Sequence, residues 1–181
     1  MRPTNTLALA LIATLLPGSV LGQAGPDPLE PEAIRAMLDQ AGGRDEYPGD
    51  HTLTVHHHTD VTVEGSGLSH VVDRRVVKVL DAEGVKQTSV LRFDYDPASQ
   101  FMEVRWVRVF KKNGKILKLN LDKTRDLPQP DHGIRWGARM KVVGVPGLSP
   151  GDSVAWESYS KGFQIAYLGP EEAAAATEGD E

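Results

Sequence analysis

The sequence contains no cysteine, and this absence removes two kinds of chemistry. A chain without thiols forms no disulfide bonds, and it has no thiolate to serve as a nucleophile. Attachment to a bacterial membrane through a lipidated cysteine is excluded for the same reason. We therefore expect an ordinary hydrophobic core to stabilise the folded protein.

Long apolar runs are lacking too. The run from Leu7 to Leu16 has ten residues, whereas a helix that spans a bilayer needs about 20. Arg2 precedes this run, and Pro17-Gly18 and small residues follow it, which is the layout of a secretory signal peptide. We predict a signal peptide over residues 1–24. The mature protein should then be exported to the periplasm or the cell exterior, without a membrane span.

Apart from one end, the chain has almost no excess charge. Residues 171–181 hold five acidic residues and no basic ones, and removing these five and Arg2 leaves 20 acidic against 19 basic residues. A nearly neutral body gives no electrostatic footprint for nucleic acid. The segment 169–181 has little apolar content and is predicted to be an acidic, disordered tail. Phosphate-binding loops, dinucleotide fingerprints and nucleophile elbows are also missing.

The rest of the chain divides into a short leader segment and a β-domain. Residues 25–44 are a proline-rich linker and a short helix, in which Ile34, Met37, Leu38 and Ala41 form one apolar stripe before Gly42-Gly43. From residue 45 to 168 the apolar residues recur with a period of two, as in half-buried strands. Helices of useful length between strands are not predicted, so the strands should be antiparallel.

These patterns predict an all-β fold with one short N-terminal helix. We expect an antiparallel β-sandwich, or a strongly bent antiparallel sheet, of about seven or eight strands. Within the predicted strand 101–110, Val104 and Trp106 share one parity while Val107 and Val109 share the other, which indicates a β-bulge near Trp106. Residues 122–133 are predicted to be the longest irregular stretch.

Four segments have further sequence signatures, in the order RVVKVLDAEG (75–84), FDYDPASQ (93–100), VRVFKKNGK (107–115) and PGLSPGDSVAWESY (146–159). Together they resemble a bacterial family of exported domains of unknown function that usually lie N-terminal to a transglutaminase-like domain. The resemblance implies an accessory β-domain, here expected to stand alone without a transglutaminase part. It carries over no catalytic residue, because the chain has no thiol.

A row of histidines suggests a metal site. His56, His58 and Asp60 alternate along one predicted strand face, and His/Asp sets of this kind bind zinc or copper. His70, on the next predicted strand, would join the row if the hairpin register allowed. A solvated polar strand face is the competing interpretation. His57 lies on the opposite, apolar face and is predicted to be a hydrogen-bonded core histidine.

The candidate binding residues are Arg135, Trp136 and Arg139. They directly follow the irregular stretch 122–133, and functional residues are often carried on loops of a rigid β scaffold. Trp and Arg are frequent at interface hot spots. In the sharper form of this hypothesis the two arginines make the contact while Trp136 supports the strand.

The sequence as a whole favours a non-catalytic, exported β-domain that docks onto a protein or a component of the cell envelope. We expect it to be no enzyme and to need no cofactor. A module that binds a sugar or a peptide is the main alternative, and a metal-dependent hydrolase is a further one.

Overall fold

A computed structural model describes residues 30–130 and 137–163 of the chain. Their strands form two antiparallel sheets. In chain order the elements are α1 (Pro31–Gln40), β1 (Thr52–Val63), β2 (Leu68–Val79), α2 (Ala82–Thr88), β3 (Val90–Tyr95), β4 (Gln100–Phe110), β5 (Ile116–Lys118), a 3-10 helix (Leu121–Lys123), β6 (Arg125–Pro128), β7 (Arg139–Gly144) and β8 (Ser153–Phe163).

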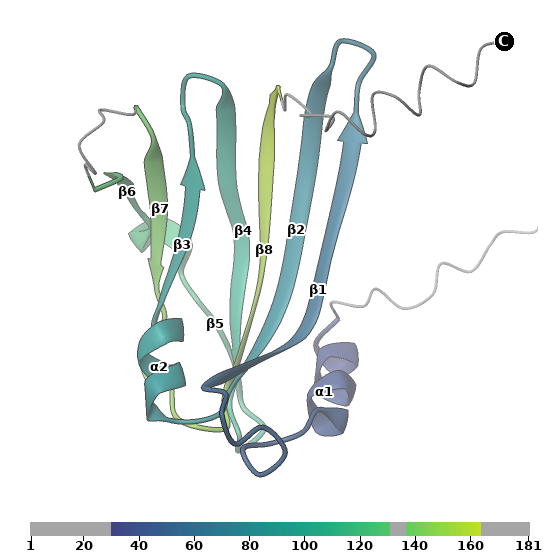
Figure 1. Cartoon of the computed structure of the whole chain (residues 1–181), viewed down its shortest axis with the longest axis vertical. Helices are drawn as coiled ribbons and strands as arrows, with labels where there is room; N and C mark the ends of the chain where they lie inside the picture. The colour runs from purple at the N-terminus through teal and green to yellow at the C-terminus, as the bar shows by residue number, and fades with distance from the viewer. Residues whose placement is uncertain (1–29, 131–136, 164–181) are drawn as a thin grey trace, which may run out of the picture.

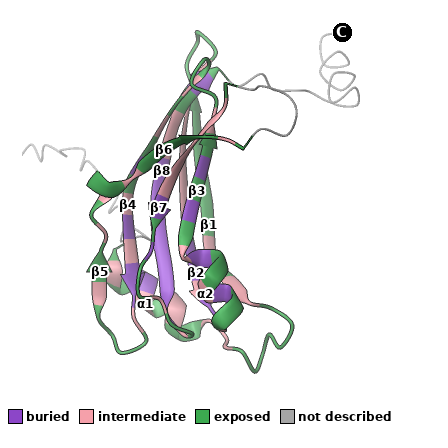
Figure 2. Cartoon of the chain, turned by 90° about the vertical axis from the view of Figure 1, so that its left-hand side faces the viewer, coloured by how far each residue is buried: buried purple, intermediate pink, exposed green. Residues whose placement is uncertain are grey.

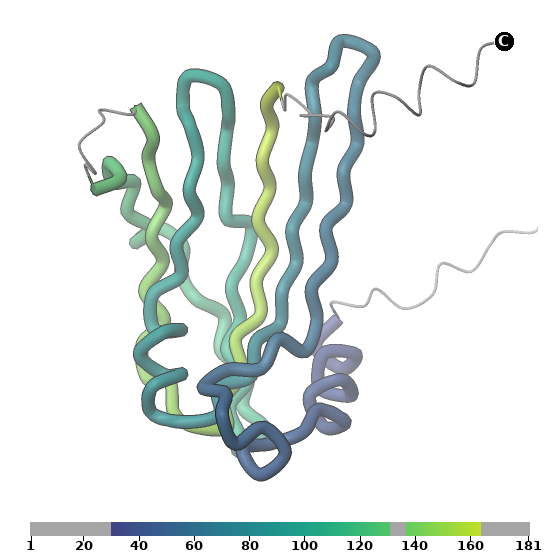
Figure 3. The backbone as a smooth tube through the Cα atoms, viewed as in Figure 1, coloured from purple at the N-terminus to yellow at the C-terminus, as the bar shows by residue number. Residues whose placement is uncertain are grey.

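The larger sheet has the strand order β1-β2-β8-β4-β5, and the smaller has the order β3-β7-β6. Figure 1 shows the long strands of the first sheet side by side, with β3, β7 and β6 grouped at one side of the molecule and β1 at the other. The predicted sandwich-like all-β class with about eight strands is confirmed. Figure 3 shows that α1 and the turns around it lie together at one end of the strands.

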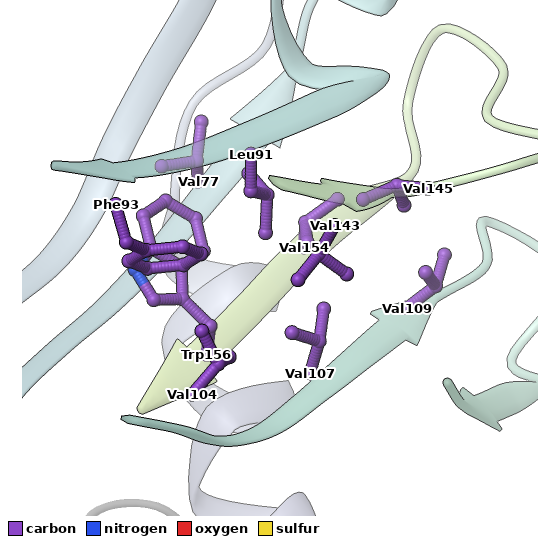
Figure 4. Close-up of a cluster of buried hydrophobic side chains, with 10 residues drawn as sticks. All are labelled: Val77, Leu91, Phe93, Val104, Val107, Val109, Val143, Val145, Val154 and Trp156. Carbon is purple, nitrogen blue, oxygen red and sulfur yellow. The ribbon is translucent and has the colours of Figure 1, made fainter. Parts of the chain in front are cut away.

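The core lies between the two sheets. Ten buried residues, nine from the two sheets and Val145 from the segment after β7, form this core and are drawn in Figure 4: Val77, Leu91, Phe93, Val104, Val107, Val109, Val143, Val145, Val154 and Trp156. Trp156 meets Phe93 edge to face, with ring centroids 6.5 Å apart, an arrangement that aromatic pairs favour. Val154 and Trp156 lie on the same face of β8, and this face is therefore the inner face of the larger sheet.

A second, smaller cluster packs the other face of the larger sheet against α1. Ile34 is fully buried there with Val76, Phe110 and Ala155. The predicted apolar stripe of the N-terminal helix thus contacts the sheet. Because α1 has only 10 residues, it covers only part of this outer face.

Two expectations about irregular segments were wrong. No helix was predicted between the strands, but the segment after Asp81 forms α2, with the Asp81 side chain accepting a hydrogen bond from the Gly84 N–H at the helix N-terminus. The stretch 122–133, expected to be irregular, contains part of the 3-10 helix and strand β6. The last residues of that stretch, 131–133, lie outside the described residues.

The predicted bulge in β4 is confirmed, since the pairing of β4 with β8 shifts between Val104 and Trp106. A second bulge, which was not predicted, shifts the pairing of β1 with β2 between Thr54 and His56. Each bulge inserts one extra residue, so the residues before and after it face opposite sides of the sheet.

His57 is not a core histidine. Its side chain is 44% exposed and its Nε2 lies 2.8 Å from Asp73 Oδ1. It does face the inner side of the larger sheet, opposite Arg75. However, the smaller sheet lies at the other side of the molecule (Figure 1), so Val61 and Val63 on the same face of β1 are 55% and 62% exposed. Residues 57–63 of β1 are all exposed, whereas β2 is mostly intermediate or buried; Figure 2 colours the chain by this burial.

Candidate functional site

The two bulges build the outer face of the larger sheet, the face on which α1 lies. In β4, Val104 packs into the inner core while Trp106 packs on the outer side with the α1 cluster. In β1, the bulge at Val55 puts His56 opposite the outer-facing Val76. Bulges are frequent where a strand must re-aim side chains at a functional surface.

Glu157 is the centre of a charged network on this outer face. Its residue is only 9% exposed, and its carboxylate accepts hydrogen bonds from Arg74 Nε at 2.8 Å and from an Arg105 terminal nitrogen at 3.2 Å. Arg74 also donates to the Asp60 carboxylate. Burial acts to lower the pKa of Arg74, but the hydrogen bonds to Glu157 and Asp60 outweigh it and raise the pKa above its ordinary value.

Aromatic rings continue the network towards the end of the sheet farthest from α1. The guanidinium of Arg105 lies 4.5 Å from the centroid of the Tyr159 ring. His70 joins Tyr159 to Glu64, with its Nδ1 2.7 Å from the Tyr159 hydroxyl and its Nε2 2.7 Å from Glu64 Oε1. The hydrogen bond from His70 is the main cause that lowers the pKa of Glu64.

A second stacked pair lies nearby on β4. The guanidinium of Arg108 lies 4.6 Å from the centroid of the Trp106 ring, within the range of cation–π attraction. Phe101, 56% exposed, lies 6.3 Å from the Tyr159 ring. We name the aromatic–arginine strip for the five residues Phe101, Arg105, Trp106, Arg108 and Tyr159.

The structure brings the predicted metal residues onto this same face. The His56 and His58 rings stack with centroids 6.3 Å apart, and His58 Nε2 lies 2.9 Å from Asp60 Oδ1. Burial, followed by the charge of His58, lowers the pKa of His56. The hydrogen bonds from His58 and then from Arg74 lower the pKa of Asp60.

The Asp60 carboxylate is thus already engaged by Arg74. Within residues 30–130 and 137–163, no group of three or more His, Asp or Glu side chains is placed to hold a metal ion. His70 does not join the row, because it pairs opposite Thr62 and bonds Glu64 and Tyr159 instead.

Of the predicted binding residues, only Arg139 lies within the described part of the chain; Arg135 and Trp136 lie outside it. Arg139 Nε donates to Asp126 Oδ1 at 2.8 Å, and the Tyr95 hydroxyl donates to Asp126 Oδ2 at 2.6 Å. These bonds, from Tyr95 first, lower the pKa of Asp126 to about 2. Arg139 therefore ties β7 to β6, and Tyr95 ties β3 to the same Asp126 carboxylate; the Arg139 side chain remains 38% exposed.

Sequence reasoning missed Arg74, Arg105, Tyr159 and Glu157. Strand alternation was a signal for the last two, since it puts Glu157 and Tyr159 on the face opposite Trp156. The arginine partners of Glu157 could not be predicted from the sequence, because Arg74 lies 83 residues away from Glu157 in the chain and Arg105 lies 52 residues away. Only the strand order β2-β8-β4 brings the three together.

The architecture is that of an antiparallel β-sandwich domain, and among the described residues α1 covers part of the outer face of the larger sheet. The particular family follows from comparison with known sequences. Residues 65–169 match DUF3857, a domain of unknown function with a solved structure, and the chain belongs to this family.

Among solved structures, the fold is similar to part of a protein from Parabacteroides distasonis ATCC 8503 described as a "putative protease". The TM-score is 0.56 at 16% identity, and the similarity covers 65% of this chain but 24% of that one. At this identity the likeness shows a shared fold alone. This chain spans about a quarter of the length of that protein.

A second solved structure is the CBM3a-L domain of the scaffoldin cipA from the Clostridium thermocellum cellulosome. It aligns with a TM-score of 0.37 at 11% identity, over 62% of this chain and 68% of that one, which is too weak to carry an argument. No curated protein matches the chain. In the described ranges, no helix is long and apolar enough to cross a membrane.

Proposed function

We propose that this protein is an exported, non-catalytic β-domain that docks onto a catalytic protein of the transglutaminase-like or protease type. The contact is made by the aromatic–arginine strip. The main support is that Arg105 stacks on Tyr159 and Arg108 on Trp106, on the outer sheet face of which α1 covers part.

The composition of the strip supports a protein contact. Interface hot spots are rich in Trp, Tyr and Arg, and the strip contains all three. Its side chains are also pre-ordered: Arg105 is fixed by Glu157 and Tyr159, and Tyr159 is fixed in turn by His70. Pre-ordering lowers the entropy lost when a partner binds.

Two similarities support a catalytic protein as the partner. A similar fold occupies a quarter of a larger protein described as a "putative protease", and the sequence motifs resemble domains that accompany transglutaminase-like domains. A β-sandwich of this kind therefore serves best as an accessory to a catalytic domain, whether in one polypeptide or as separate chains.

Export and the lack of catalysis rest on the sequence. The layout of residues 1–24 is that of a signal peptide, and the absence of cysteine leaves no thiolate for transglutaminase-type chemistry. The domain then contributes binding, and its partner contributes the reaction.

Capture from an envelope extract with two matched variants tests the proposal. Phe101→Glu places a charge on the strip, whereas Val63→Glu places one on a similarly exposed apolar residue of the inner face. The unmodified protein and Val63→Glu should retain a transglutaminase-like or protease protein, identified by mass spectrometry. Phe101→Glu should retain at least tenfold less. Equal capture by both variants, or capture of no such protein, would refute the proposal.

A further inference from the structure

A cavity of about 480 Å³ lies at the end of the molecule that carries α1, away from the aromatic–arginine strip. Its walls come from α1, the segment after it, the end of β2 and two turns that flank β4 and β8. The lining includes Arg35, Leu38, Asp39, Lys78, Phe110 and Lys112. Its volume is within the range of roughly 300–1,000 Å³ that is usual for small-molecule sites.

The lining is strongly basic, with five basic side chains and one acidic one. Two of the basic groups are neutralised by carboxylates outside the lining: Arg44 pairs with Asp81, and Lys111 pairs with the buried Asp152. This leaves three basic side chains in the cavity against Asp39.

The Lys78 side chain binds the C-terminal end of α1. Its Nζ donates to the carbonyl oxygens of Ala41 at 2.9 Å and Leu38 at 3.4 Å. These are free carbonyl groups at the C-terminus of α1, where a positive charge is favourable. Arg35 donates to the Gly114 carbonyl, and Lys112 makes no side-chain hydrogen bond in the described structure. None of Arg35, Lys78 and Lys112 has a carboxylate partner among the described residues, and of the three Lys78 is held by two carbonyl groups, which leaves Arg35 and Lys112 as the better placed to bind a ligand.

The turns are shaped so that Lys112 can lie across the cavity wall. Gly151 has a φ of 90°, and a Cβ added there would lie 3.0 Å from Lys112 Cδ, so glycine leaves the space that the lysine stem occupies. Asp152 joins the two turns: it accepts from the Lys112 N–H at 2.9 Å and from the Ser149 N–H at 2.7 Å. Burial acts to raise the pKa of Asp152, but the hydrogen bonds from Lys111 and from these two amides outweigh it and lower the pKa below its ordinary value.

We infer that this cavity binds a small, multiply charged organic anion. Arg35 and Lys112 hold its phosphate or carboxylate groups, since both side chains are hydrogen-bond donors that recognise such oxygens. The apolar part of the ligand packs on Leu38 and Phe110. This site is separate from the proposed docking surface, and it lies where two turns with family-like signatures, KKNGK and PGLSPGD, meet.

Titration calorimetry of the full chain with inorganic pyrophosphate and with citrate tests the site. We expect saturable one-site binding of at least one of the two. The one that binds better tells whether phosphate or carboxylate is the preferred group. Lys112→Gln should weaken this binding at least tenfold without changing the melting temperature, because the lysine side chain makes no hydrogen bond. Lys123→Gln, an exposed lysine outside the cavity, should leave binding unchanged.

Three results would overturn the inference: no saturable binding of either anion, equal weakening by both lysine variants, or tighter binding of a peptide with the sequence of residues 171–181 than of either anion. The last outcome would assign the cavity to an acidic chain segment instead. None of these measurements uses the docking partner, so the site can fail while the proposed function holds, and the reverse.

Discussion

The two faces of the five-stranded sheet are built from the same strands but hold opposite kinds of side chain. The inner face carries valines and Trp156 against the smaller sheet. The outer face carries α1 over part of its area and, beyond it, ion pairs and stacked rings centred on Glu157 and Tyr159. The difference teaches that the inner face buries most of the hydrophobic core, whereas the described residues leave most of the charged and aromatic side chains of the outer face exposed or only partly buried.

Truncating the inner face should have the largest effect. Trp156→Ala removes a residue that is 9% exposed and packs on Phe93, so it should cost about 3–5 kcal/mol of unfolding free energy. Trp106→Ala, on the outer face, should cost less because Trp106 is only partly buried. Urea unfolding measures both. Equal losses of unfolding free energy in the two variants would contradict the proposed contrast between the faces.

Glu157→Ala should have the next largest effect. It leaves Arg74 and Arg105 without their shared acceptor, which should cost about 1–3 kcal/mol. Glu103→Ala is the control, because Glu103 is an exposed acid of the same outer face; its change should stay within about 0.5 kcal/mol. If the two variants unfold at the same urea concentration, the network does not stabilise the sheet.

A smaller effect concerns the thermal stability of the protein at acidic pH. The pKa of Asp60 is lowered in the folded protein from an ordinary value of 3.8, first by His58 and then by Arg74. A carboxylate with a lowered pKa stabilises the fold above its unfolded pKa, and this contribution is lost as the pH falls through the folded value. Asp60→Asn should therefore reduce the fall in melting temperature below pH 3.8, and Asp94→Asn, at another exposed acid, should not. If the melting temperatures of both variants fell equally with decreasing pH, the result would contradict a stabilising role for the bonds of Asp60 to His58 and Arg74.

The smallest expected effect concerns zinc binding by the predicted metal residues. A zinc ion on His56, His58 and Asp60 must displace Arg74 from the Asp60 carboxylate. Zinc should therefore raise the melting temperature of Arg74→Gln more than that of the unmodified protein, and His56→Ala with His58→Ala should abolish the shift. The absence of any zinc-dependent shift in Arg74→Gln would dispose of this metal site.

Much of the fold was predictable because the alternation of apolar and polar residues within each strand can be seen in the local sequence. The sandwich class, the bulge near Trp106 and the apolar stripe of α1 all follow from local periodicity. The helix α2 was missed because AEGVKQT contains Gly84 and follows a turn-like Asp81, which also serves as an N-cap. The bulge at Val55 was missed because polar residues flank it on both sides.

The candidate surface was less predictable because it depends on strand order. Trp106 and Arg105 both lie on the outer face through the β4 bulge, and no local pattern says that β8 pairs between β2 and β4. The histidine row was found by local spacing, but its bond to Arg74 depends on the β1–β2 register.

Site-specific photocrosslinking in the native cell envelope tests the docking surface most directly. A photoreactive phenylalanine analogue replaces Phe101 on the outer face in one strain and Val63 on the inner face in another. We predict that position 101 forms a crosslink to a transglutaminase-like or protease protein and that position 63 does not. Crosslinks of equal yield from both positions, or from position 63 alone, would contradict the assignment of the outer face as the docking surface.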